Sequence, residues 1–134
     1  MKKKNVPTEE VLNFHWHIKN FLATGGKPSR SEQLNWLKEK GFQAIVSLEL
    51  FSANIFSDMV AAGINHLWLD LDADSQTDFD PYKIEPRIWE KFYAFITNQL
   101  DQGHRVFVHC SAGINRSFKL VQRYLNETAN LRQT

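Results

Sequence analysis

The sequence predicts a single α/β domain in which a central, mostly parallel twisted sheet is flanked by helices. Three observations predict this fold class. Short apolar runs alternate along the chain with longer segments of helical periodicity, an order that is typical of parallel sheets. The length of 134 residues suits one domain. No internal repeat, low-complexity run or linker divides the chain into parts.

Residues 14–22 carry β-favouring aromatic side chains that are interrupted near the middle, which predicts a short hairpin. Residues 24–28 combine glycine and proline and are expected to form a loop. A helix should follow, because Ser29 and Glu32 fit a capping box in which the serine accepts from an amide and the glutamate reaches back. Gly41 stands where this helix is expected to stop.

The middle of the chain is expected to add two strands and a helix. Residues 43–48 form an apolar run that predicts a buried strand. Residues 54–62 predict a helix, which ends at a glycine. Residues 64–71 predict a second strand, because leucines alternate there with tryptophan and aspartate. Residues 72–81 are rich in aspartate and are expected to form an acidic loop.

The last third predicts a long helix, a short strand and a final helix. Pro86 suits the first turn of a helix. Apolar side chains follow it at three- and four-residue spacing until Gly103. Residues 105–108 predict a short buried strand. The final helix should begin near Gly113 and continue through Leu125.

Composition excludes several classes of protein. Hydrophobic residues are 43% of the chain, which is enough apolar surface to exclude disorder. No run approaches the ~18 apolar residues of a membrane span, so we expect no membrane association. The net charge of +1 supplies no basic field, so we expect no nucleic-acid partner. A single cysteine and the lack of a signal-peptide core predict a cytoplasmic protein, with a flexible start over residues 1–10.

The most informative stretch is His109-Cys110-Ser111-Ala112-Gly113-Ile114-Asn115-Arg116-Ser117, where a strand delivers a cysteine to the start of a helix. Backbone amides at such a junction converge on one hollow and favour an anion. The planar guanidinium of Arg116 can grip two oxygens of a phosphate. The residues expected to hold phosphate are Ser111, Ala112, Gly113, Ile114, Asn115 and Arg116.

Cys110 is expected at the bottom of this hollow as a nucleophile. The pKa of a cysteine falls to about 3.5–7.5 at a helix N-terminus or beside cations. A thiolate beneath a bound phosphate can attack phosphorus and form a phosphocysteine. Ser117 can hydrogen-bond the sulfur and help it to leave, whereas His109 is expected to support the loop through hydrogen bonds. The alternative, an inert buried cysteine, leaves the neighbouring arginine unexplained.

This motif resembles the signature of the cysteine-dependent protein tyrosine phosphatases, and its residue sequence is most similar to that of the small atypical dual-specificity branch. The resemblance extends over about residues 14–125. It implies a phosphatase domain over residues 11–134 that works without metal or cofactor. The substrate it implies is a phosphorylated protein or a small phosphoester.

The resemblance also implies an aspartate, on a loop before the long helix, that protonates the leaving oxygen. Five aspartates lie in this region. Asp74 is the first candidate, because the sequence around it is similar to that of the family's acid loop, and Asp72 is the second. Asp70 is expected to stay exposed on its strand. Asp78 and Asp80 are expected to be solvated loop charges.

Other interpretations of the acidic and histidine residues are weaker. The aspartates at 70, 72 and 74 begin like a calcium loop, but Ser75 replaces the turn glycine and Pro81 replaces the bidentate glutamate. Aspartyl-nucleophile phosphatases of the haloacid dehalogenase kind need threonine or valine where Asp74 stands, and a longer chain. His15 and His17 could form a metal pair, but no third ligand is evident, so two surface histidines are expected.

Two departures from the family's pattern bear on packing and assembly. The bulky Phe118 follows the motif where a small residue or proline is common, which is expected to change the packing behind the loop. The chain stops at Thr134, so it is either minimal or completes its core with a second chain, and the sequence leaves both oligomeric states open. The alternatives are a phosphoinositide or RNA 5′-triphosphate phosphatase on the same scaffold, and a phosphate-binding module that has lost catalysis.

Overall fold

Five strands form one sheet in the order β1-β2-β5-β3-β4. The computed structural model describes residues 6–71, 79–112 and 114–132, with side chains as far as residue 129. The two edge strands are β1 (His15–Ile18) and β4 (Asn65–Trp68), and the inner strands are β2 (Leu22–Gly25), β3 (Phe42–Ser47) and β5 (Arg105–His109). β1 pairs antiparallel with β2, and every other pairing is parallel. The prediction of a mostly parallel sheet is therefore confirmed.

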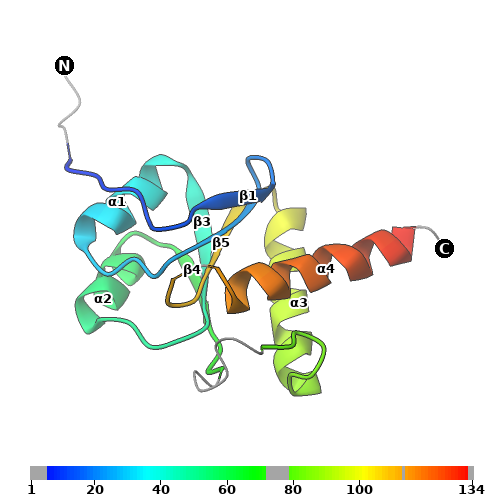
Figure 1. Cartoon of the computed structure of the whole chain (residues 1–134). Helices are drawn as coiled ribbons and strands as arrows, with labels where there is room; N and C mark the ends of the chain where they lie inside the picture. The colour runs from blue at the N-terminus through cyan, green and yellow to red at the C-terminus, as the bar shows by residue number, and fades with distance from the viewer. Residues whose placement is uncertain (1–5, 72–78, 113, 133–134) are drawn as a thin grey trace.

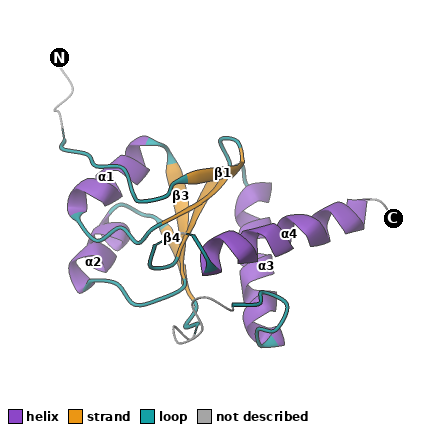
Figure 2. Ribbon diagram, viewed as in Figure 1, coloured by secondary structure: helices purple, strands orange, loops and turns teal. Residues whose placement is uncertain are grey.

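Two helices cover each face of the sheet (Figures 1 and 2). On one face α1 (Ser31–Glu39) and α2 (Ala53–Ala61) enclose a core that includes Leu37, Ile45, Met59 and Phe107. On the other face α3 (Pro86–Asp101) and α4 (Arg116–Arg132) enclose a core that includes Val46, Phe92, Val108 and Leu120. Within the described residues, no helix combines the length and the apolar character that a membrane crossing requires.

The start of α1 differs from the predicted capping box. The helix begins at Ser31, and the residue that reaches back is Gln33 rather than Glu32. The Oε1 atom of Gln33 accepts from the backbone N–H of Ser29 at 2.8 Å and from that of Arg30 at 3.3 Å. Gln33 is buried, whereas Glu32 is more exposed. The neutral amide therefore fills the inward position, where a carboxylate would have to be desolvated.

Three predicted boundaries also move. Thr24 and Gly25 belong to β2 rather than to a loop, because they pair with Val108 and His109 of β5. A side chain at position 25 would bring its Cβ to 2.9 Å from Phe107 Cε1, so glycine allows the strand to continue there. The second predicted strand is shorter than 64–71, since β4 ends at Trp68. The final helix starts at Arg116 rather than near Gly113, which lies outside the described residues.

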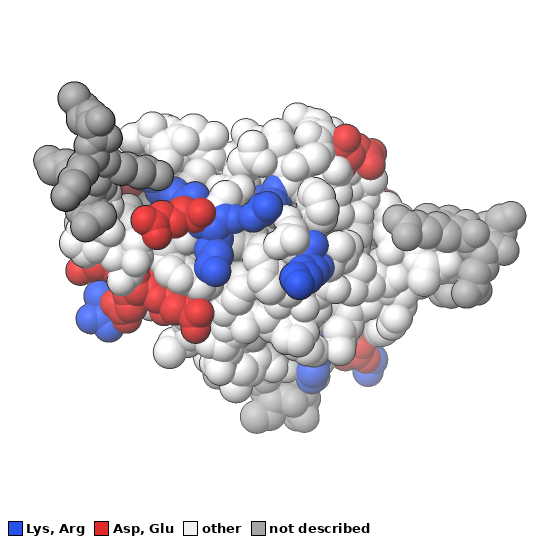
Figure 3. Space-filling view, turned by 90° about the horizontal axis from the view of Figure 1, so that it is seen from above, with Lys and Arg blue, Asp and Glu red and all other residues white. Residues whose placement is uncertain are grey.

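The carboxyl ends of the parallel strands meet at one edge of the sheet, which is the usual place for a ligand in this architecture. β3, β4 and β5 end there at Ser47, Trp68 and His109. The opposite end, where these strands begin, is seen in Figure 3, in which Lys and Arg side chains gather near the middle of the face and acidic ones lie mainly toward its margins. The candidate site therefore lies at the far end from that view.

Candidate active site

The loop between β5 and α4 is tied to its neighbours through its own carbonyl groups. The backbone N–H of Lys27 donates to the Ser111 oxygen at 3.1 Å, and Nδ2 of Asn13 donates to the Ala112 oxygen at 2.8 Å. The N–H of Leu48 donates to the His109 oxygen at 3.0 Å. These bonds fix the peptide planes of the loop from two sides, so its position depends on segments distant in the sequence.

Cys110 directly follows β5 and is buried, with 2% of its surface exposed. Its Sγ atom lies 3.2 Å from Oγ of Ser117, in the first turn of α4. Ser117 is also fully buried. A hydroxyl donor and the amino end of a 17-residue helix both favour negative charge on this sulfur. The predicted role of Ser117, to stabilise a sulfur anion, needs this short contact and stays a prediction.

Arg116 opens α4 and lies almost entirely inside the protein. Its Nη2 atom is 2.9 Å from Oε2 of Glu49, and its Nη1 atom donates to the Leu71 oxygen at 3.3 Å. Lys27 approaches the other carboxylate oxygen of Glu49, with Nζ 3.2 Å from Oε1. Burial opposes the charge of Glu49, but hydrogen bonds and charges of Arg116 and Lys27 outweigh it and lower the pKa of the carboxyl. The lowered pKa favours the carboxylate form of Glu49, which pairs with the guanidinium of Arg116.

His109 takes part in a chain of hydrogen bonds that links the Cys110 peptide to β3 and β4. Its Nε2 atom is 2.6 Å from Oγ of Ser47, and the same hydroxyl is 2.8 Å from Nε2 of His66. Its Nδ1 atom lies 3.2 Å from the Cys110 oxygen. Burial lowers the pKa of His109 to about 4, so the imidazole is neutral at pH 7. The prediction that His109 supports the loop through hydrogen bonds is compatible with this neutral ring and its contact with the Cys110 oxygen, and its role stays a prediction.

Acid should destabilise the fold through His109. The folded chain holds this ring neutral with a pKa of about 4, whereas the unfolded ring titrates near 6.5. Between these values only the unfolded state binds the proton, so the free energy of unfolding falls as the pH drops through this window, on the order of 1 kcal/mol per pH unit. Urea unfolding between about pH 7 and about pH 4.5 measures it.

The matched variant for that measurement is His109→Gln, which removes the titrating group and keeps a polar side chain. Its unfolding free energy should fall less steeply with acid than that of the parent. The pKa of His17 is also lowered to about 4, so part of the slope should remain. An identical slope in the two proteins would assign the acid sensitivity to other groups.

The two acid candidates, Asp74 and Asp72, lie outside the described residues, and so does Asp78. Asp70 is exposed as predicted, but it lies beyond the end of β4 at Trp68 rather than on the strand. Asp80 is partly buried, and its Oδ1 atom accepts from the N–H of Tyr82 at 2.9 Å, which makes it a turn residue.

Two further loop residues differ in their exposure. Ile114 is 67% exposed. Nδ2 of Asn115 is buried, and in the described part of the chain it is the one buried side-chain nitrogen or oxygen without a hydrogen-bond partner. Phe118 lies against the hairpin, with ring centroids 5.2 Å from His15 and 4.7 Å from His17. The bulky residue after the motif therefore packs on β1.

The rings of His15 and His17 lie beside each other on β1, with centroids 4.7 Å apart. Nε2 of His17 is 2.9 Å from Oγ1 of Thr24, which satisfies the ring within the hairpin. Over residues 6–71, 79–112 and 114–132, no three histidine, cysteine or carboxylate side chains are grouped as metal ligands.

Three residues of the site were not identified from the sequence: Ser47, Glu49 and Lys27. Ser47 and Glu49 stand at and just beyond the end of β3, which neighbours β5 in the sheet. Ser47 and Glu49 could have been identified from the sequence as polar residues at the carboxyl end of a buried parallel strand. Lys27 carries no such signal, since its position depends on how the loop after β2 folds back.

The arrangement can bind and attack a tetrahedral oxyanion. A buried sulfur beside a hydroxyl is the type of group that can act as a nucleophile, and a guanidinium paired with Glu49 can present parallel donors to an oxyanion. A guanidinium has five N–H donors, so contacts with Glu49, Leu48 and Leu71 leave some for a ligand.

Known proteins with similar sequences are phosphatases. Tyrosine-protein phosphatase yvh1 of Schizosaccharomyces pombe is 38% identical over 65 residues, which cover 48% of this chain and 18% of that protein. Putative tyrosine phosphatase 123R of Invertebrate iridescent virus 6 is 28% identical over 85 residues, which cover 63% of this chain and 51% of that protein. The chain thus spans about half or less of the length of these curated relatives.

A solved structure shows the same fold. The core catalytic domain of the PP-IP phosphatase SIW14 from S. cerevisiae superposes with a TM-score of 0.61 at 19% identity, covering 84% of this chain and 63% of that one. The family model described as "Dual specificity phosphatase, catalytic domain" matches residues 24–134, which is most of the chain. The match includes the loop from Cys110 to Arg116. This chain belongs to the dual-specificity phosphatase catalytic-domain family.

Proposed function

We propose that this chain hydrolyses phosphomonoesters of proteins, with phosphotyrosine or phosphoserine/threonine as substrate, through a phosphocysteine on Cys110. One observation carries the proposal. The buried sulfur of Cys110 lies 3.2 Å from the Ser117 hydroxyl, and Arg116, held by Glu49 at 2.9 Å, opens the same helix. A lone inert cysteine would need neither a hydroxyl donor nor an adjacent guanidinium.

The first chemical step forms the S–P bond and breaks the P–O bond of the ester. The Cys110 thiolate supplies the electron pair, and the leaving oxygen takes a proton from an aspartic acid, for which Asp74 is the first candidate and Asp72 the second. Arg116 and the loop amides hold the three equatorial oxygens, over which charge is spread in the transition state.

The second step regenerates the enzyme. Water attacks phosphorus, the aspartate formed in the first step takes its proton, and the S–P bond breaks. Ser117 stabilises the departing sulfur by donating its hydroxyl hydrogen across the 3.2 Å contact. The products are the free thiolate and inorganic phosphate, so neither metal nor cofactor is required. A thiolate nucleophile needs a reducing compartment, which fits a cytoplasmic protein with a single cysteine.

Side-by-side turnover tests this function on the unmodified chain. The substrates are a phosphotyrosine peptide, a phosphoserine peptide, inositol phosphates and triphosphate-ended RNA. We expect a phosphopeptide to give a kcat/KM at least about tenfold above those of inositol phosphates and RNA. Preference for either non-protein substrate would contradict the protein-phosphatase assignment. Tight phosphopeptide binding without turnover would identify a phosphate-binding module instead.

A further inference from the structure

We propose that His66 is a positioning residue that acts on the peptide of Cys110 by fixing the tautomer of His109. It acts through the hydroxyl of Ser47. The inference rests on the proposed function, because it concerns the nucleophile of that reaction. Ser47 and His109 end two neighbouring strands of the sheet, and His66 lies on the edge strand β4.

The side chains of these residues form one continuous chain of short contacts. Nε2 of His66 is 2.8 Å from Oγ of Ser47. The same hydroxyl is 2.6 Å from Nε2 of His109, whose Nδ1 lies 3.2 Å from the Cys110 oxygen. Ser47 and His109 are fully buried, whereas His66 is half-buried. The chain therefore connects the edge of the sheet to the peptide of the proposed nucleophile.

The chemistry of these groups fixes the position of each hydrogen in the chain. A carbonyl oxygen only accepts, so Nδ1 of His109 carries the hydrogen of that contact. The ring is neutral at pH 7, because burial lowers the pKa of His109 to about 4, and its Nε2 is therefore an acceptor. The Ser47 hydroxyl must donate to that nitrogen, which leaves the Ser47 oxygen to accept from Nε2 of His66.

Aromatic side chains pack against both imidazole rings. The ring of Phe51 lies 5.3 Å from that of His66 and 5.8 Å from that of His109, at interplanar angles of 83° and 84°. Phe56 of α2 lies 5.8 Å from His66, so the chain is on the face of the sheet that α1 and α2 cover. Burial also lowers the pKa of His66 below its ordinary value of 6.5. A neutral His66 has one N–H, and the contact with Ser47 uses it.

The donor of His66 decides which way the Ser47 hydroxyl points. Without it, the Ser47 oxygen can accept from Nε2 of His109, and the ring can adopt its other neutral tautomer. Nδ1 would then face the Cys110 oxygen without a hydrogen, and the loop would lose this bond. With His66 in place, each donor hydrogen of the chain points toward Cys110, so the aligned bonds favour negative charge at this residue.

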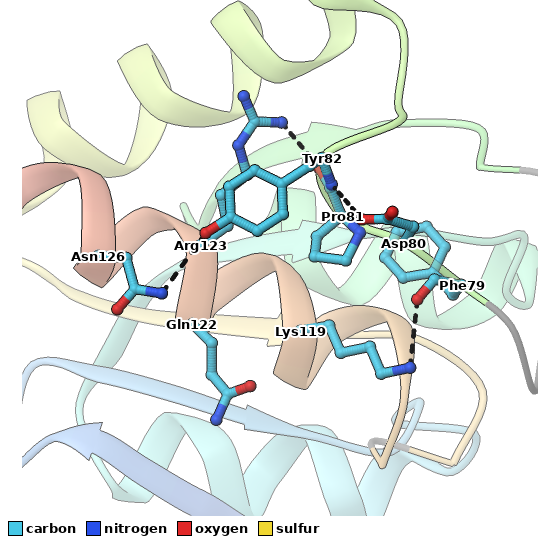
Figure 4. A pocket seen from close by; sticks show the side chains of 8 residues that line it. All are labelled: Phe79, Asp80, Pro81, Tyr82, Lys119, Gln122, Arg123 and Asn126. Carbon is cyan, nitrogen blue, oxygen red and sulfur yellow. Dashed lines mark hydrogen bonds between the residues drawn. The ribbon is translucent and has the colours of Figure 1, made fainter.

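The opposite side of the site is held by α4 through contacts that are made without His66. Arg116 pairs with Glu49 at 2.9 Å. Farther along the helix, Nζ of Lys119 donates to the oxygen of Phe79 at 3.1 Å (Figure 4), and the ring of Phe79 is buried in the core beside α4. Loss of His66 should therefore weaken the thiolate and leave phosphate binding intact.

The pH profile of Cys110 alkylation by iodoacetamide, measured without substrate, tests the inference. Cys110 is the chain's one cysteine, so the rate reports its thiolate alone. His66→Met should lower the rate about three- to tenfold at acidic pH, where it follows the thiolate fraction, and less than about twofold at alkaline pH, where the thiol is ionised. His66→Gln is the matched variant, because its amide supplies an N–H in place of Nε2, and it should keep the parental profile. Calorimetric affinity for inorganic phosphate should stay within about twofold in both variants.

A double-mutant cycle tests whether His66 acts through Ser47. Ser47→Ala should change the profile as His66→Met does, and the double variant should differ from Ser47→Ala by less than about twofold. His104→Met is the control, because His104 is also half-buried and contacts Gln99 at 2.7 Å, near the other end of β5. It should keep the parental profile.

His66→Asn replaces His66→Met if the apolar variant folds poorly, since its shorter side chain keeps the amide away from Ser47, and it should show the same loss. A parental profile in the variant that lacks the donor, an equal loss in His66→Gln, or an equal fall at acidic and alkaline pH would overturn the inference. Turnover that does not depend on Cys110 would instead overturn the proposed function. Alkylation requires no turnover, so the two failures are distinguishable.

Discussion

Cys110→Ser is expected to lower the hydrolysis of p-nitrophenyl phosphate by at least about 10³-fold. A serine hydroxyl is almost fully protonated at neutral pH, and the Ser117 hydroxyl, 3.2 Å from the sulfur position, is not a base that could remove its proton. The sulfur position therefore stabilises an anion that cysteine can form and serine cannot. Steady-state turnover of purified protein measures the effect.

Phosphate binding separates this result from a loss of fold. Arg116 and Glu49 remain in Cys110→Ser, so its affinity for a phosphopeptide should stay within a few-fold of the parent value, with an unchanged circular dichroism spectrum. Parental turnover in this variant would contradict the nucleophile assignment directly.

Arg116→Lys is the second substitution with a large expected effect, a fall in kcat/KM of about 10²–10³-fold. Lysine keeps the positive charge, so Glu49 still has a partner, but the ammonium is a point charge and cannot present two parallel donors to one phosphate. The substitution also removes the planar guanidinium group that Glu49 and the Leu71 carbonyl orient in the parent protein.

Arg105→Lys provides the matched control, because it makes the same change at the other end of β5. Nη1 of Arg105 donates to the Lys40 oxygen at 2.7 Å, far along the strand from the loop. Its kcat/KM should stay within about twofold of the parent value. If Arg116→Lys loses no more activity than Arg105→Lys, the guanidinium does not hold the reacting phosphoryl group.

The inner strands could be predicted because their apolar runs are buried. The run predicted as a strand over residues 43–48 contains Ala44, Ile45 and Val46, which are fully buried in β3. The predicted ends of some strands and helices differ from the structure because they depend on local packing, which the hydrophobic pattern of the sequence does not encode. Gly25 was assigned to a loop on composition, yet it stays in β2 because its strand must pass close to the ring of Phe107.

The candidate site could be predicted only where its residues are neighbours in the sequence. The stretch from His109 to Ser117 carries its own chemistry in one motif. Glu49 and Lys27, which orient Arg116, join it through strand order and a returning loop, and neither can be read from spacing. The same holds for Lys119, whose partner carbonyl is 40 residues away.

The most direct measurement of the central claim is the covalent intermediate itself. The enzyme is mixed with a phosphorylated substrate, quenched in denaturant within one turnover and analysed by peptide mass spectrometry. A phosphoryl group should appear on the peptide that contains Cys110 and be absent from Cys110→Ser. Turnover of the parent without a phosphoryl group on Cys110, or with one on another residue, would contradict the mechanism.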